Sequence, residues 1–332
     1  MRRSAVPSLI ALGRRTRAGR GTVSWDTSAV AALNSVAAKF ADRGVEVEMT
    51  GLNQHSAQLH ARTRGIWPRP PEPIQKERHT TEGRTRSMTA SKGALDGRKA
   101  LVTGATSGIG RATTLRLARA GATVMATGRD SGALDLLAKE ADNLGLAVLA
   151  QPATFPNTDD VAKLVDAVRH QLGGLSILVH SAGLYQRGPL AESALAELDD
   201  LFSVNVSVPY QLTQAFLPDL GRGGGDVIFV NSTQGLQASA GVSQHAATKH
   251  ALRALADPLR AEVADAGIRV CTVYPGRTAT RMQEQIIRDE GRLWNPDTLL
   301  HPDDVAEVIA TAVTMRGDVA LTDIMVRPAR RL

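Results

Sequence analysis

The sequence predicts an α/β protein: a doubly wound parallel sheet, preceded by a small partial α/β segment and a disordered linker. From residue 88 to residue 332, short apolar runs alternate with longer amphipathic stretches such as residues 161–172. Strands that are apolar nearly throughout are typical of parallel sheets with helices on both faces, and right-handed crossovers make such sheets doubly wound. The runs predicted as strands are residues 101–103, 123–126, 147–150, 177–180, 227–231 and 269–273.

A glycine-rich turn, TGATSGIG at residues 103–110, joins the first apolar run to the helix-like residues 111–120. Gly104 permits the tight turn, Gly108 lets a pyrophosphate approach the backbone, and Gly110 lets the helix pack close to the strand. The N-terminus of that helix offers free N–H groups and the positive end of its dipole to phosphates. The pattern therefore predicts dinucleotide binding on a Rossmann-type sheet.

Composition narrows the classes of function. Hydrophobic residues make up 43% of the chain, enough for a sizeable core, whereas aromatic residues make up only 3%. Few aromatic residues argue against stacking on bases, so we expect no nucleic-acid partner. No apolar run approaches the roughly 18 residues that span a membrane, so we expect no membrane partner. Cys271 is the only cysteine, which excludes an intramolecular disulfide and a cysteine metal cluster and fits the cytoplasm.

The residues from 88 to 332 resemble a complete short-chain dehydrogenase/reductase. The motifs that carry the resemblance are TGATSGIG, HSAG at residues 180–183, the serine after VIFVN, and YPGRTAT at residues 274–280. The resemblance implies an NAD(P)-dependent oxidoreductase that interconverts a small-molecule carbonyl and a secondary alcohol. The catalytic residues it implies are Asn205, Ser232, His245 and Lys249. The cofactor-binding residues it implies are Thr103, Gly104, Ser107, Gly108, Ile109, Gly110, Arg129, Ser181, Ala182, Gly183, Lys249, Pro275, Gly276 and Thr278.

One catalytic position departs from the family. Four residues before Lys249 the family carries its catalytic tyrosine, and this chain carries His245 there, thirteen residues after Ser232. The imidazole reaches less far than a tyrosine hydroxyl, and Lys249, one helical turn away, disfavours its protonated form. We therefore predict an intact cofactor site with weakened redox turnover. The alternative is a nucleotide-binding protein without catalysis, a sensor or a scaffold.

The end of the second predicted strand indicates which nicotinamide cofactor is preferred. An acidic residue there binds the ribose 2′-hydroxyl of NAD, but this chain has Thr127, Gly128 and then Arg129. An arginine at this place pairs with a 2′-phosphate through two parallel hydrogen bonds. We therefore expect NADP and consider NAD the weaker candidate. The alternative is a solvated surface arginine beside Asp130.

Two further expectations concern the substrate and the assembly. Residues 277–294 contain apolar side chains among charged ones and predict a helical lid over the substrate, with ordinary packing as the alternative. The resemblance implies a homo-oligomer with two-fold symmetry. Pro258 lies inside a predicted helix that commonly supports the family's subunit interface, and we expect it to kink that helix.

The first 87 residues divide into three predicted parts. Residues 1–21 contain six arginines and no acidic residue, and form a basic disordered tail rather than a nucleic-acid arm or targeting peptide. Residues 22–65 resemble the second half of a STAS domain, the cytoplasmic module of sulfate-transporter-like permeases. Half a module buries little apolar area, so the segment either docks on the reductase domain or is a remnant of fusion or frameshift. Residues 66–87 are proline-rich and charged, which predicts a linker.

Overall fold

The computed structural model describes residues 93–329. The predicted basic tail, STAS-like segment and linker lie outside the described residues, so the division of the chain into these parts stays a prediction. Within the described part, no helix is long and apolar enough to cross a membrane.

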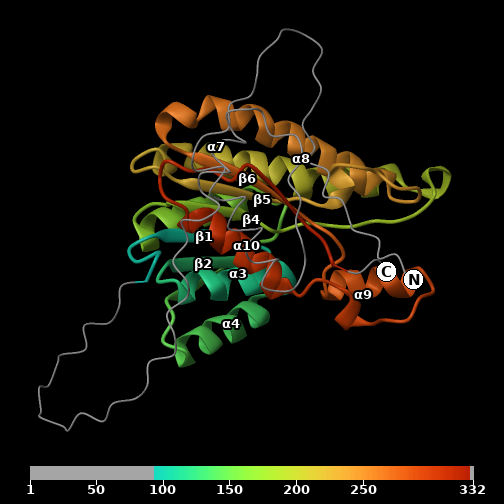
Figure 1. The fold of residues 1–332 in the computed structure, drawn as a ribbon, viewed down its shortest axis with the longest axis horizontal. Helices are drawn as coiled ribbons and strands as arrows, with labels where there is room; N and C mark the ends of the chain where they lie inside the picture. Colours follow the sequence, from blue (N-terminus) through green and yellow to red (C-terminus); the bar gives the residue numbers. More distant parts are fainter. Residues whose placement is uncertain (1–92, 330–332) are drawn as a thin grey trace, which may run out of the picture. The chain divides into compact units, whose positions relative to one another are not determined.

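Seven parallel strands form the sheet, in the spatial order β3-β2-β1-β4-β5-β6-β7 (Figure 1). The order reverses between β1 and β4, where Val102 pairs with Ala126 of β2 on one side and with Val179 of β4 on the other. Ligands bind at such a switch point, beyond the carboxyl ends of the strands. The strands are β1 (Lys99–Thr103), β2 (Thr123–Gly128), β3 (Val148–Pro152), β4 (Ile177–His180), β5 (Asp226–Val230), β6 (Arg269–Pro275) and β7 (Asp323–Val326).

Helices cover both faces of the sheet. The α-helices are α3 (Gly108–Arg119), α4 (Ser131–Asn143), α5 (Thr158–Ala167), α6 (Leu195–Phe202), α7 (Val208–Leu220), α8 (Ser243–Glu262), α9 (Arg281–Asp289) and α10 (Pro302–Thr314). In Figure 1, α7 and α8 lie together on one side and α3, α4 and α10 on the other. Successive residues of a strand face opposite layers. Ala100 and Val102 accordingly pack with α3 and α10, whereas Leu101 packs with α7 and α8.

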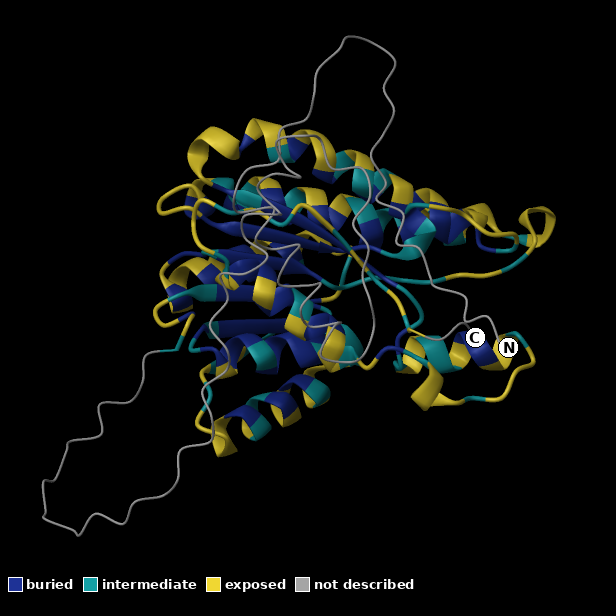
Figure 2. Cartoon of the chain, viewed as in Figure 1, coloured by how far each residue is buried: buried dark blue, intermediate teal, exposed yellow. Residues whose placement is uncertain are grey.

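The shorter helical elements lie mainly in the connections around the cleft. The π-helical segments are η1 (Val168–Leu172) and η3 (Ser203–Ser207). The 3₁₀ segments are η2 (Leu190–Glu192), η4 (Thr233–Gly235), η5 (Ala264–Ala266) and η6 (Pro296–Thr298). Figure 2 shows the central strands dark blue and buried, with exposed residues on the outer faces of the helices, while the edge strands β3 and β7 are half-buried or exposed. The sheet is therefore the rigid part of the molecule, and its loops carry the site.

The six predicted strands are confirmed within a residue or two, and one strand was not predicted. The strand β7 was not predicted, because it lies at the sheet edge and alternates exposed and half-buried residues instead of forming an apolar run. The helix α8 continues through Pro258 to Glu262. Pro258 and Ala254, whose carbonyl loses its helical partner, are both exposed, so the proline does not end the helix, and the expected kink stays a prediction.

Candidate active site

The glycine turn after β1 is packed too tightly for side chains. Gly104 has φ +67°, and a Cβ added to it would lie 2.8 Å from the backbone of Ala182. A Cβ on Gly110 would collide with the carbonyl of Gly104. The turn therefore presents bare backbone at the start of α3, whose first turn carries no acidic residue. Free N–H groups at a helix start make this a fitting cradle for a phosphate.

Thr103 connects two turns of the site from beneath. Its buried hydroxyl accepts hydrogen bonds from the backbone N–H groups of Ser181 and Ala182, each at 3.0 Å, and donates to the Val179 carbonyl at 3.4 Å. The turn after β4 is thereby fixed against the glycine turn after β1. Thr103, predicted to bind the cofactor, lies behind the surface of the cleft and positions that surface.

A single cavity of about 690 Å³ runs along the carboxyl ends of the strands. Thr103 and Asn205 lie outside its lining, and both are buried. The other predicted site residues line it, namely Gly104, Ser107, Gly108, Ile109, Gly110, Arg129, Ser181, Ala182, Gly183, Ser232, His245, Lys249, Pro275, Gly276 and Thr278. The fold therefore gathers into one cleft residues that are up to 174 positions apart, from Gly104 to Thr278.

Asn205 lies in η3, a π-helical interruption between α6 and α7. Its Oδ1 accepts from the N–H of Leu184 at 2.8 Å, and its Nδ2 donates to the Leu184 carbonyl and to Thr248 Oγ1, both at 3.0 Å. Short π-helical segments in helices are frequent at functional sites. Here the segment turns Asn205 inward, where it fixes both the loop after β4 and the helix α8.

Ser232 and Lys249 lie at the inner end of the cleft. Ser232 lies two residues after the end of β5, and its Oγ accepts from the N–H of Gln234 at 3.1 Å. Lys249 is buried on α8, and its Nζ donates to the Val230 carbonyl at 3.2 Å. Burial lowers the pKa of Lys249 to about 8. The ammonium is therefore held in place, mostly charged at neutral pH, with donors left for a ligand.

His245 lies one turn before Lys249 on α8, with only 6% of its surface exposed. Its Nδ1 has no hydrogen-bond partner among the described residues, and its ring packs at 4.8 Å, centroid to centroid, from the ring of Tyr185. Burial, reinforced by the charge of Lys249, lowers the pKa of His245 to about 3. The imidazole is therefore neutral at pH 7.

The outer end of the cleft carries a cation. Arg129 follows β2, is exposed, and makes no ion pair within residues 93–329. The neighbouring Asp130 caps α4 by accepting from the N–H of Ala133 at 2.9 Å. A free guanidinium at the end of β2 suits an anionic group on an adenosine ribose.

Residues 277–294, the predicted lid, contain the helix α9, whose Ile286 and Ile287 are buried, and its role over a substrate stays a prediction. Glu290, at its end, accepts from both Nη atoms of Arg277, at 2.8 and 2.6 Å. Arg187 and Arg292 also contact the Glu290 carboxylate. The hydrogen bonds from Arg277 lower the pKa of Glu290 to about 2, so the carboxylate stays charged and ties the lid to the loops after β4 and β6.

The residues that line the cleft but were not predicted as individual site residues include Thr106, Thr280 and Arg281. Thr106 lies inside the glycine motif, where the glycines drew attention. Thr280 and Arg281 become neighbours of that motif only in the folded chain, since a Cβ on Gly108 would meet Thr280 Cγ2 at 2.8 Å. Thr280 also caps α9 by accepting from the N–H of Gln283 at 3.2 Å.

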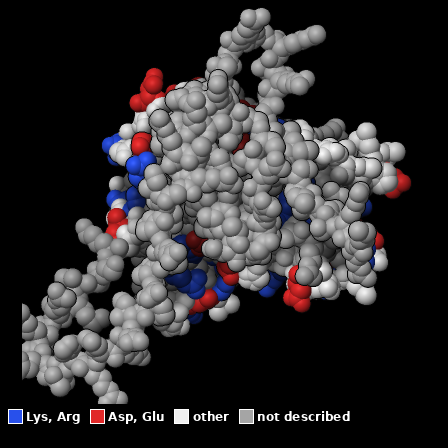
Figure 3. Space-filling view, in the orientation of Figure 1, with Lys and Arg blue, Asp and Glu red and all other residues white. Residues whose placement is uncertain are grey.

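The distribution of surface charge indicates whether a protein face is suited to bind nucleic acid. Figure 3 shows basic and acidic side chains interspersed over the visible part of one face. An extended basic stripe, the electrostatic footprint of a nucleic-acid-binding protein, is not seen in that part of the face.

The sheet order, the glycine turn and the serine–lysine pair define a Rossmann-type, nucleotide-binding class of protein. A family model described as short chain dehydrogenase matches residues 98–291. The chain therefore belongs to the short-chain dehydrogenase family, and it is an oxidoreductase of that type.

Known relatives agree with this assignment. Gluconate 5-dehydrogenase of Gluconobacter oxydans (strain 621H) is 34% identical over 200 residues, which cover 59% of this chain and 77% of that protein. A short chain dehydrogenase from Burkholderia cenocepacia J2315, solved in complex with NADP, has a TM-score of 0.64 and 32% identity, covering 70% and 97% of the two chains. The 3-ketoacyl-(acyl-carrier-protein) reductase from Brucella melitensis, complexed with NADH, has a TM-score of 0.63 and 28% identity, covering 71% and 99%.

Proposed function

We propose that the protein is an NADP-dependent short-chain reductase that interconverts a small carbonyl compound and its secondary alcohol, with turnover weakened by His245. The observation that carries the proposal is a complete nucleotide cleft around a neutral histidine at the position of the family's catalytic tyrosine. The alternative is a nucleotide-binding protein without turnover, and His245 in place of the tyrosine supports this alternative as well.

The choice of NADP is supported by the end of β2. Relatives of similar likeness were solved with NADP and with NADH, so the fold alone does not decide between them. Arg129 lines the cleft without an ion pair among residues 93–329, and Asp130 is engaged in the cap of α4. The free guanidinium favours a 2′-phosphate over a bare 2′-hydroxyl.

The cofactor, when bound, supplies the hydride, and the chain supplies binding, orientation and proton transfer. Ser232 Oγ already accepts from Gln234, so its own proton is free to be donated to a substrate oxygen. Lys249, held by the Val230 carbonyl, has donors left for the hydroxyl groups of a nicotinamide ribose. Asn205 is engaged with Leu184 and Thr248, which keeps the floor of the cleft in place.

The proposed low turnover results from His245 as the proton donor. Reduction of a carbonyl needs a proton at the developing alkoxide, and a neutral imidazole gives up its N–H proton far less readily than an imidazolium does. With a pKa of about 3, only roughly one His245 in 10⁴ is protonated at pH 7. That fraction agrees with the loss of about 10²–10⁴-fold that removal of a general acid typically causes.

The test is the variant His245→Tyr, assayed for NADPH-dependent reduction of a panel of small carbonyl compounds. Because tyrosine restores a hydroxyl at the inner end of the cleft, we expect turnover to rise about 100-fold or more, with NADPH affinity unchanged. The matched control is His245→Phe, which adds a similar ring without the hydroxyl and should not raise turnover. A rise of less than tenfold in the tyrosine variant contradicts weakened catalysis. NADPH binding without turnover in both proteins selects the nucleotide-binding alternative.

A further inference from the structure

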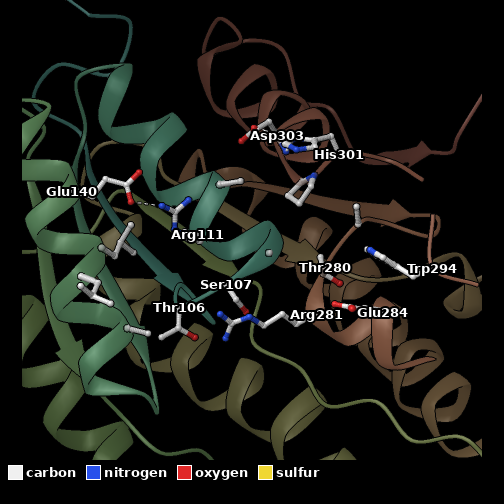
Figure 4. A pocket seen from close by; sticks show the side chains of 17 residues that line it. Thr106, Ser107, Arg111, Glu140, Thr280, Arg281, Glu284, Trp294, His301 and Asp303 are labelled. Carbon is white, nitrogen blue, oxygen red and sulfur yellow. Dashed lines mark hydrogen bonds and ion pairs between the residues drawn. The ribbon is translucent and has the colours of Figure 1, made fainter. Parts of the chain in front are cut away.

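A second cavity, of about 570 Å³, lies under the lid and opens beside the glycine turn (Figure 4). Two of its lining residues are arginines, Arg111 and Arg281. Arg111 is neutralised by an ion pair with Glu140, drawn as a dashed line in Figure 4. Arg281 makes no ion pair or hydrogen bond through its guanidinium within residues 93–329, so its charge is available to a ligand.

The start of α9 places Arg281 over the glycine turn. Arg281 is the first residue of α9, directly after Thr280, whose Cγ2 would lie 2.8 Å from a Cβ on Gly108. In Figure 4 its guanidinium points away from α9 toward Thr106 and Ser107. Arg281 also lines the large cleft, so its side chain lies where the two cavities meet.

The end of β2, which Arg129 follows, also packs against Thr106. A Cβ on Gly128, the residue before Arg129, would lie 2.8 Å from Thr106 Cγ2. Thr106 is therefore flanked by the end of β2 on one side and by Arg281 on the other. The acidic neighbours of the two arginines are engaged elsewhere, since Asp130 caps α4 and Glu284 pairs with Arg288.

We infer that Arg281 binds the 2′-phosphate of the cofactor together with Arg129, so that the lid itself selects NADP over NAD. The inference rests on the proposed function. A 2′-phosphate carries close to two negative charges and accepts hydrogen bonds on three oxygens, which suits two guanidinium groups. The diphosphate, in contrast, is served by the backbone N–H groups at the start of α3. The charge of Arg281 is therefore left for the 2′-phosphate, which Arg129 alone would neutralise only in part.

The experiment measures equilibrium binding of NADPH and NADH by nucleotide fluorescence, without substrate. Arg281→Ala should weaken NADPH binding by about 10- to 100-fold, the range for a charge-assisted hydrogen-bonded pair, and leave NADH within about threefold. Arg281→Lys should fall between the alanine variant and the wild type, because it keeps the charge but loses the planar fork. The matched control is Arg119→Ala, the same charge change at an exposed arginine that ends α3, away from the glycine turn at its start, which should change neither affinity.

The outcomes separate this inference from the proposed function. Equal weakening of NADPH and NADH binding by Arg281→Ala would place the arginine on the diphosphate and overturn the inference. An unchanged NADPH affinity would overturn it as well. Wild-type protein that binds neither nucleotide would refute the proposed function, and the inference would fail with it.

Discussion

The two halves of the cleft differ in how their tasks are distributed over the chain. The cofactor half, around β1, β2 and α3, is built mostly from backbone: a glycine turn, a helix start and the hydroxyl of Thr103 beneath them. The carbonyl half, around β5 and α8, depends on single side-chain atoms of Ser232, His245 and Lys249. Binding in the first half depends on the shape of the backbone, whereas proton transfer in the second half depends on individual side chains. We therefore expect binding and turnover to be separable in this protein.

The substitution with the largest expected effect disrupts the glycine turn in the cofactor half of the cleft. Gly104→Ala adds a Cβ 2.8 Å from the backbone of Ala182, at a φ of +67° that alanine rarely adopts. Both turns must shift, so we expect NADPH affinity to fall by about 1,000-fold or more, measured by nucleotide fluorescence.

The matched control is Gly145→Ala, which has the same φ of +67° but nothing within 4 Å of the added Cβ. It should lower stability by about 1 kcal/mol from backbone strain and leave nucleotide binding intact. If both variants bound NADPH like the wild type, the close approach of the two turns would have no role in binding.

The halves also differ in how well the sequence predicts them. The cofactor turn could be predicted because its constraints are local: three glycines lie within seven residues, between an apolar run and a helix. The assignment of catalytic positions rests on the family resemblance, in which motif spacing places His245 four residues before Lys249. The six central strands followed from apolar runs buried on both faces.

The features that escaped prediction depend on tertiary contacts. Arg281 and Thr106 are far apart in the chain, and only the placement of α9 against the glycine turn makes them neighbours. The edge strand β7 has no apolar run, because one edge and part of its faces meet water. The position of Lys249 one turn away predicted part of the neutral state of His245, but its larger cause, burial of a ring that packs beside Tyr185, depends on tertiary contacts.

The next prediction concerns stability below neutral pH. Burial lowers the pKa of His180 to about 3, and burial with the charge of Lys249 does the same for His245. Between pH 6.5 and 3 the unfolded chain binds these protons and the folded chain does not, so stability falls as pH falls through this window. Each histidine should remove about 2 kcal/mol of unfolding free energy between pH 7 and pH 5, measured by urea denaturation.

Variants assign this pH dependence to the two histidines. His180→Asn keeps a hydrogen-bonding group near Thr213, which lies 2.8 Å from the histidine Nε2, and should halve the dependence. His180→Asn combined with His245→Tyr should nearly abolish it above pH 5. The paired carboxylate of Glu290, with a pKa of about 2, titrates only below this range. A pH dependence that persists in the double variant would mean that other groups cause it.

The smallest expected effect concerns Lys249 and tests whether this residue of the carbonyl half lowers the stability of the folded protein. Because burial lowers the pKa of Lys249 to about 8, the unfolded chain binds its proton more tightly, and wild-type stability rises with pH between about 8 and 10.5. Lys249→Met removes the buried ammonium and should stabilise the protein at pH 7 by roughly 1–2 kcal/mol, while nucleotide affinity falls. The Val230 carbonyl loses its donor, which offsets part of the gain.

Lys163→Met, at an exposed lysine on α5, is the control and should change neither property. If Lys249→Met were instead less stable at pH 7, the lysine would hold the fold together, and stability and function would not be in conflict at this position.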